Sequence, residues 1–260
     1  MSLGFVRTNN EAVQTGGNAP AIGTGDFTLA AWVYRTDSGA VRQTVASLGT
    51  HAPSMVVRQS STNVFTCYHG ASVYAFDTAL SLGEWYFLAI RRSGSTLEGF
   101  VNGVKEATSH SYSTSIAAAV LTVGSASPIA TNPIGAKIED LALWGRAVSD
   151  SELASIHRGR LRAVFLRTGV MGYWPLNAAG DAVLDAYASG DLGGRDHSRI
   201  NANLDLSAVS ANAPDWDAAS PGLHGPSRVH VVPNVGTVGA GRRISLGGIY
   251  VSGGRVVSAG

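Results

Sequence analysis

Apolar and polar residues alternate along much of the first 150 positions, the pattern of β-strands that bury one face. The segment 27–34 predicts one such strand, whose core-facing residues are Phe27, Leu29, Ala31 and Val33. Further short strands are predicted at 55–58, 65–69 and 73–76, separated by turns rich in Ser, Thr, Asn, Gly and Pro. These strands and the 32 glycines predict an all-β fold.

Two hairpin strands follow. Residues 85–91 are apolar on both faces, which predicts a central strand, and 96–101 form its partner. Asn102 and Gly103 tolerate the positive φ angles of a type I′ turn, so 104–107 should return antiparallel.

A strand at 138–144 leads into the clearest helix signal in the chain. Ser149 and Glu152 have the spacing of a capping box, in which each side chain bonds the other residue's backbone amide. We expect a short helix from Asp150 to His157, ended by Gly159, with Leu153 and Ile156 as its packing face.

Three of these segments, 26–33, 83–103 and 138–153, resemble the hallmark strands of laminin-G-like domains. The resemblance implies a concanavalin-like antiparallel β-sandwich jelly roll with one short helix over residues 1–165. One feature departs from the family order: the Tyr-Trp-Pro-Leu strand that commonly opens these domains stands at 173–176, after the main body. This strand either closes its own sandwich, begins a truncated second one, or completes a neighbour's.

The rest of the chain divides into two regions. Residues 166–225 contain the displaced strand and an irregular, Ala-, Gly-, Asp- and Asn-rich stretch that packs on the sandwich or on a neighbour. Residues 226–260 form a basic, glycine-rich C-terminal β-arm with strand patterns at 229–232, 249–251 and 256–257. Such an arm is suited to adding strands to a neighbouring subunit. The residues assigned to assembly are Arg228, Arg242, Arg243, Tyr250 and Arg255.

No catalytic pattern is present, and we expect the protein not to be an enzyme. Glycoside hydrolysis needs two carboxylates that flank the bond, and the Glu-x-Asp-x-x-Glu spacing of related glucanases is absent. Glu139 and Asp140 are adjacent, so on a regular strand they point to opposite faces. The single cysteine, Cys67, lies in a predicted strand and is interpreted as a packed thiol.

Binding residues are sought among surface aromatics, because sugar sites use aromatic faces beside polar groups. We select Tyr68, His69, Tyr74 and Tyr112 as the surface candidates and assign Trp32, Trp85 and Trp144 to the core. The family resemblance implies a structural calcium at Asp140, with a simple surface or capping role as the alternative. No other cofactor is expected.

Composition and context suggest where such a protein works. A net charge of +1 gives no argument for nucleic acid or a membrane as partner, and no secretory signal or membrane-spanning run is visible. The chain has one cysteine, no Asn-x-Ser/Thr sequon, and far more arginine than lysine. Together with only 14% charged residues, these features predict a bacteriophage virion protein, either a capsid decoration (cement) protein or a tail fibre or attachment protein. Its partners would be other virion proteins and copies of itself; the alternative is a lectin-like module that recognises cell-surface glycans.

Overall fold

A computed structural model provides the structure of the chain. It describes residues 2–39, 42–49, 53–58, 62–126 and 131–159, several positions between 163 and 176, and the backbone of five short strands after residue 205. The chain divides into two units, Met1–Pro221 and Gly222–Gly260. Within the described residues, no helix has the length and apolar character needed to span a bilayer.

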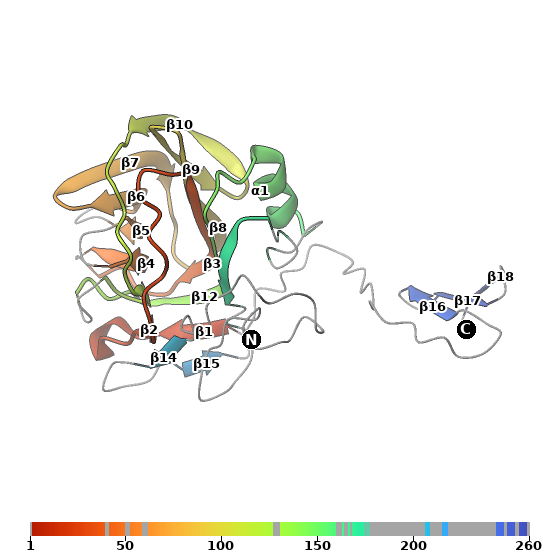
Figure 1. The fold of residues 1–260 in the computed structure, drawn as a ribbon. Helices are drawn as coiled ribbons and strands as arrows, with labels where there is room; N and C mark the ends of the chain where they lie inside the picture. The colour runs from red at the N-terminus through yellow and green to blue at the C-terminus, as the bar shows by residue number, and fades with distance from the viewer. Residues whose placement is uncertain are drawn as a thin grey trace. The chain divides into compact units, whose positions relative to one another are not determined.

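The first unit is a sandwich of two antiparallel sheets (Figure 1). Sheet A runs in the order β10 (Val104–Ser111), β9 (Thr96–Val101), β8 (Trp85–Ser93), β3 (Phe27–Arg35), β12 (Ala136–Trp144), β1 (Ser2–Phe5) and β15 (Asp215–Asp217), with β13 (Val170–Trp174) also paired to β12. Sheet B runs in the order β14 (Leu206–Ala208), β2 (Val13–Thr15), β11 (Leu121–Val123), β4 (Gln43–Leu48), β5 (Ser54–Arg58), β6 (Val64–His69) and β7 (Ser72–Ala79). The 3-10 turn η1 (Arg7–Asn9) and the helix α1 (Asp150–His157) complete the described elements of this unit. The predicted all-β sandwich with one short helix is confirmed.

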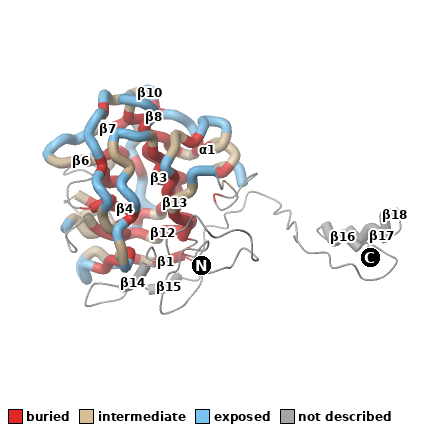
Figure 2. Tube along the Cα trace, in the orientation of Figure 1, coloured by how far each residue is buried: buried red, intermediate tan, exposed pale blue. Residues whose placement is uncertain are grey.

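The core lies between the two sheets and is built by strand alternation. The four residues predicted to face inward from β3 all belong to it. Phe76 of β7 packs so closely on Gly99 of β9 that a Cβ at position 99 would lie 2.5 Å from its ring, so glycine is required where the sheets meet. Figure 2 shows β3 and β12 buried along most of their length.

The predicted turn and helix are both confirmed, and they pack on each other. Asn102 and Gly103 have φ angles of 53° and 73°, as a type I′ turn requires. The capping box of Ser149 and Glu152 is complete at the start of α1. A Cβ on Gly103 would lie 2.8 Å from Cα of Ala154, so the helix rests directly on the turn.

The displaced Tyr-Trp-Pro-Leu segment closes its own sandwich, the first of the three alternatives. Residues 172–174 of β13 pair with the second half of β12, while β1 pairs with the first half of the same edge. Trp174 is fully buried in the core. One long edge of β12 is therefore shared by two short strands that are far apart in the sequence.

The strands β7 and β10 end their sheets on the same side and are joined by side chains. Glu106 accepts hydrogen bonds from the backbone amides of Asp77 and Thr78 at 2.8 and 2.6 Å. Asp77 in turn accepts from the Thr108 amide at 2.8 Å and from its hydroxyl. These bonds occupy backbone groups that an open sheet edge would expose.

The second unit contains a three-stranded antiparallel sheet of β16 (Arg243–Leu246), β17 (Ile249–Ser252) and β18 (Arg255–Ser258). The strands expected at 249–251 and 256–257 are present and pair with each other, with Ser252 opposite Arg255, and β16 was not predicted. Among the arm residues assigned to assembly, Arg243, Tyr250 and Arg255 lie on these strands. Arg228, Arg242 and the predicted strand at 229–232 lie outside the described residues.

Candidate functional site

Three of the four aromatic or histidine residues selected as binding candidates come together at the end of the sandwich where β6, β7 and β10 meet. The rings of His69 and Tyr112 have centroids 5.5 Å apart, and Tyr74 lies edge-on to Tyr112 at 5.5 Å. His110, which sequence reasoning did not select, joins them at 5.4 Å from Tyr74. We call these four residues the aromatic–histidine cluster.

The expectation that Tyr112 is a surface residue was wrong. Its side chain is 1% exposed, packs edge-on to Phe27 and lies near the Arg92 guanidinium. Arg92 donates to the carbonyls of Gly23 and Thr114 at 2.8 and 2.7 Å, which holds two loops over this end of the core. Burial raises the pKa of the Tyr112 hydroxyl, and that hydroxyl hydrogen-bonds Nδ1 of His69.

The remaining cluster residues are also largely committed to packing. Tyr74 is half-buried against the core, and His110 Nε2 hydrogen-bonds the Ala75 carbonyl at 2.8 Å. The cluster therefore fills the gap between the edge strands β7 and β10, and leaves little polar capacity for a ligand.

Tyr68 lies apart from the cluster, because successive residues of β6 point to opposite faces. Its ring is partly exposed, and the guanidinium of Arg42 lies 3.5 Å from the ring centroid. A sugar could stack on this face of Tyr68 only by displacing Arg42.

Another aromatic surface, which sequence reasoning missed, lies on the outer face of sheet A. Tyr34 of β3 is directly opposite Trp85 of β8 and also opposite Lys137 of β12. All three side chains are partly exposed. We call these three residues the outer aromatic row. The assignment of Trp85 to the core was wrong, whereas Trp32 and Trp144 are buried as expected.

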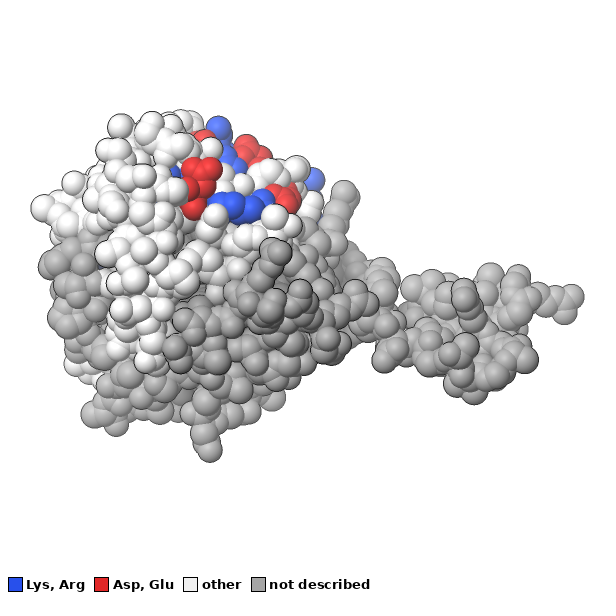
Figure 3. Space-filling model, viewed as in Figure 1, with Lys and Arg blue, Asp and Glu red and all other residues white. Residues whose placement is uncertain are grey.

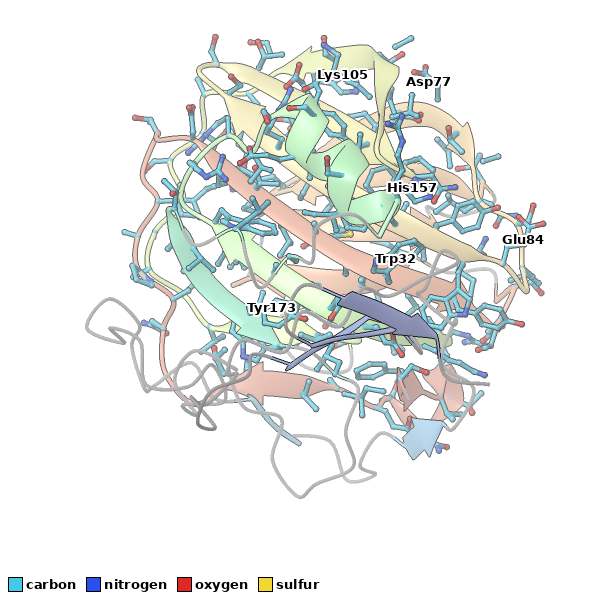
Figure 4. All side chains as sticks on the ribbon, turned by 90° about the vertical axis from the view of Figure 1, so that its right-hand side faces the viewer. Trp32, Asp77, Glu84, Lys105, His157 and Tyr173 are labelled. Carbon is cyan, nitrogen blue, oxygen red and sulfur yellow. The ribbon has the colours of Figure 1, made fainter. Side chains whose placement is uncertain are left out.

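A signal for this row was present in the sequence. Val33 and Tyr86 alternate onto the core side, so their neighbours Tyr34 and Trp85 must point outward. What the sequence could not show is where the outer face is covered. One row further along, Trp32 is 9% exposed and stacks on His157 of α1 at 5.6 Å. Figure 4 shows these two side chains together, with Glu84 at the margin of the same face.

Comparison with known proteins identifies the family. The family model of laminin-G type for the concanavalin A-like lectin/glucanases superfamily matches residues 7–154. The chain belongs to the concanavalin A-like lectin/glucanases superfamily. No curated protein matches the sequence.

Several solved structures resemble this chain at low sequence identity. A proposed carbohydrate-binding protein from Bacteroides ovatus shares 11% identity at a TM-score of 0.51, over 82% of this chain and 62% of that one. A pentraxin from Limulus polyphemus, described as a native heptamer, shares 14% identity at 0.46, over 56% and 75%. Domain 4 of an extracellular arabinanase from Geobacillus stearothermophilus, solved with arabinotriose, shares 18% at 0.44, over 56% and 76%. At 11% identity, the similarity to the Bacteroides ovatus protein establishes the fold and nothing further.

The superfamily name covers both lectins and glucanases. Because glycoside hydrolysis uses a pair of carboxylates, the acidic side chains of this chain bear on whether it could hydrolyse a glycan. Each one that the structure describes has an interaction partner. Hydrogen bonds or ion pairs engage Glu11, Asp26, Asp37, Asp77, Glu84, Glu98, Glu106, Asp140, Asp150 and Glu152, and Glu139 is engaged as well. On the face drawn in Figure 3, charged side chains gather at one end. An ion-pair network near α1 joins Arg91 to Glu98 and Asp150.

The pKa values of three of these carboxyl groups, those of Asp37, Asp77 and Glu152, are lowered. Hydrogen bonds from the Thr108 hydroxyl and amide lower the pKa of Asp77, and those from Arg146 lower the pKa of Glu152 to about 2. Burial pushes the pKa of Asp37 upward, but hydrogen bonds from Arg7 and the Gly39 amide outweigh it and lower the value. A glycosidase acid needs a raised carboxyl pKa. The buried thiol of Cys67, with its pKa raised to about 12, is equally unsuited to nucleophilic chemistry.

Asp140 occupies a structural position. It has a φ angle of 47° at a bulge in β12, where the strand alternation assumed for Glu139 and Asp140 breaks. Its carboxylate accepts a hydrogen bond from the Tyr173 hydroxyl of β13. In the part of the chain that the structure describes, no group of three or more His, Cys, Asp or Glu side chains could hold a metal ion. Calcium at Asp140 stays a prediction.

Proposed function

We propose that this chain is a non-catalytic carbohydrate-binding protein. The observation that carries the proposal is the state of its carboxylates: the described ones all have structural partners, and each resolved pKa shift among them is downward. The general acid of glycoside hydrolysis needs a raised carboxyl pKa, and none of the resolved shifts among the described residues is of that kind.

A carbohydrate is the ligand class that the comparisons support. The chain belongs to a superfamily of lectins and glucanases, and the Bacteroides ovatus protein of the same fold is described as carbohydrate-binding. The partly exposed aromatics of the sandwich supply the apolar faces that sugar sites use. The ligand would be a cell-surface glycan.

A glycan array with the full-length chain tests this proposal, followed by incubation with each bound glycan and analysis for cleavage products. We expect saturable binding to a restricted set of glycans and no products. Sustained cleavage by the purified protein would overturn the non-catalytic assignment. Absence of binding across neutral and acidic glycans would overturn the carbohydrate assignment.

Assembly within a bacteriophage particle is the second candidate function, with the protein as a capsid decoration protein or a tail fibre or attachment protein. The second unit favours it, because its three strands β16, β17 and β18 pair as a small antiparallel sheet, and strands of this kind are suited to adding to the sheet of a neighbouring subunit. A unit of 39 residues (222 to 260) without cysteine is below the size that usually folds without association.

Truncation after Gly225 tests the assembly function. We expect the sandwich to stay folded, as judged by circular dichroism, and incorporation into the virion to be lost. Normal incorporation of the truncated protein into particles would exclude an assembly role for the C-terminal arm.

A further inference from the structure

We propose that the outer aromatic row, Tyr34, Trp85 and Lys137, is the glycan contact of the sandwich, with the apolar face of a pyranose ring packed against the Trp85 indole. This inference rests on the proposed carbohydrate-binding function and locates it on the outer face of sheet A. It places the ligand away from the aromatic–histidine cluster and from Tyr68.

The strand register fixes the geometry of the row. Trp85 and Tyr34 are direct neighbours across β8 and β3, with ring centroids 5.4 Å apart at 46°. Lys137 is the next residue across, on β12, with Nζ 5.1 Å from the Tyr34 ring centroid. Tyr34 therefore has a row neighbour on each side, Trp85 and Lys137. Trp85 has a row neighbour on one side only, so a ligand can pack beside its indole. Strands packed at the centre of a sheet hold such side chains in place, which lowers the ordering cost of binding.

Exposure distinguishes this row from the rest of the face. The next outward-facing row consists of Trp32, Phe87 and Glu139, and all three are buried. The outer aromatic row is partly exposed, and beside it lies the turn that leads into β8. In that turn Leu82 is 44% exposed, and Gly83, with a φ of 75°, brings the backbone alongside the Tyr34 hydroxyl.

The polar atoms of the row also suit a sugar. Among the described residues, neither the Trp85 indole N–H nor the Tyr34 hydroxyl makes a hydrogen bond. Two donors therefore stand beside an apolar ring face, with the ammonium group of Lys137 next to them. A pyranose has a matching apolar C–H face ringed by hydroxyl acceptors, and aromatic bodies with polar tips are the usual contacts for such ligands.

The extent of the row argues against a protein partner. A stable protein interface buries about 800 Å² on each side. The row consists of two aromatic rings and Lys137, and the row beyond it is already buried. A surface of this extent matches one or two sugar rings.

The test compares variants of the full-length chain against glycans that the wild type binds on the array. We expect Trp85→Ala to weaken binding at least ten-fold and Trp85→Phe to weaken it less, since a ring remains. Tyr68→Ala is the matched control, because it removes a partly exposed aromatic from the other sheet, and it should leave the affinity unchanged. Circular dichroism and the thermal midpoint report whether each variant is folded.

A second measurement does not depend on whether Trp85→Ala folds. The indole Nε1–H signal of Trp85 in the wild-type NMR spectrum, assigned with Trp85→Phe, should shift during glycan titration. Glycan binding that leaves this signal unmoved overturns the site while the carbohydrate-binding function stands, and so does unchanged affinity in a folded Trp85→Ala. A wild type that binds no glycan overturns both. Self-association without glycan that Trp85→Ala abolishes would mark the row as a contact between copies of the chain and overturn the glycan assignment.

Discussion

At the scale of single residues, the sandwich is held closed where its sheets end by one buried carboxylate. Glu106 is 9% exposed and accepts two backbone amides and the Thr78 hydroxyl from the facing strand. Hydrogen bonds to a charged acceptor are stronger than those between neutral groups. Glu106 therefore accepts hydrogen bonds from two backbone amides of β7 that a neighbouring strand would otherwise satisfy.

Glu106→Ala should lower the free energy of unfolding by about 1.5–3 kcal/mol, the range for losing hydrogen bonds to a charged group. Lys105→Ala on the same strand is the control, because its pair with Glu98 at 3.3 Å is half-exposed and such pairs contribute little. Urea unfolding midpoints measure both changes. Equal effects of the two substitutions would contradict the role given to Glu106.

His157 should make the stability of the sandwich depend on pH. Burial, aided by Arg158, lowers the pKa of this imidazole where it stacks on Trp32. The unfolded chain therefore takes up the proton first as the pH falls through about 6.5. The stability due to neutral His157 is complete above that pH and is lost below it. His157→Gln should flatten the slope of unfolding free energy between pH 7 and 5 relative to wild type, and parallel curves would contradict this.

At the scale of elements, the helix α1 depends on its capping box and on Arg146. The Arg146 guanidinium donates two hydrogen bonds of 2.9 Å to Glu152, and Ser149 donates from its amide at 2.8 Å. These bonds keep the pKa of Glu152 at about 2, well below its unfolded value near 4.3. One carboxylate thus fixes both the helix start and the loop before it.

Glu152→Gln should cost about 1 kcal/mol at neutral pH, as lost capping interactions do. Because the folded pKa is depressed, the contribution of Glu152 is present above about pH 4.3 and is lost as the pH falls toward 2. The difference in unfolding free energy between wild type and variant should therefore shrink across this window. Denaturant titrations at pH 7, 4 and 3 measure it, and a difference that stays constant would contradict the assignment.

Sequence reasoning succeeded for elements whose signals are local. The alternation of β3, the turn at Asn102–Gly103 and the capping box of α1 depend on neighbouring residues, and each was predicted. The short strands β1, β2 and β11 were not predicted. Each has three or four residues, too few for a period to show, and each pairs with a strand distant in the chain.

The candidate site shows the same limit. Alternation places Trp85 and Tyr34 outward, but which part of an outer face is covered depends on where α1 docks. Tyr112 was misplaced for the converse reason: its burial depends on Arg92 drawing distant loops over the end of the core. Neither arrangement leaves a pattern along the sequence.

At the scale of the whole molecule, strand pairing extends the sandwich beyond the boundary predicted near residue 165. The strand β13 pairs with β12, β14 pairs with β2, and β15 pairs with β1. The unit that contains them reaches Pro221. The hallmark strands thus form the middle of sheet A, as β9, β8, β3 and β12, and later strands extend both sheets.

Two truncated chains, residues 1–221 and residues 1–165, test how much the later strands stabilise the sandwich. A chain of residues 1–221 should unfold cooperatively, because it keeps every strand of both sheets. A chain of residues 1–165 loses β13, β14 and β15 together with the fully buried Trp174. Removing that side chain alone should cost about 3–5 kcal/mol, a large share of the 5–15 kcal/mol that typically stabilises a domain. Trp174→Ala in the full chain isolates the side chain from the strands, so it should lower the urea midpoint less than the 1–165 truncation does. If residues 1–165 unfold at the same midpoint as residues 1–221, then β13, β14 and β15 pack on a sandwich that is already complete without them.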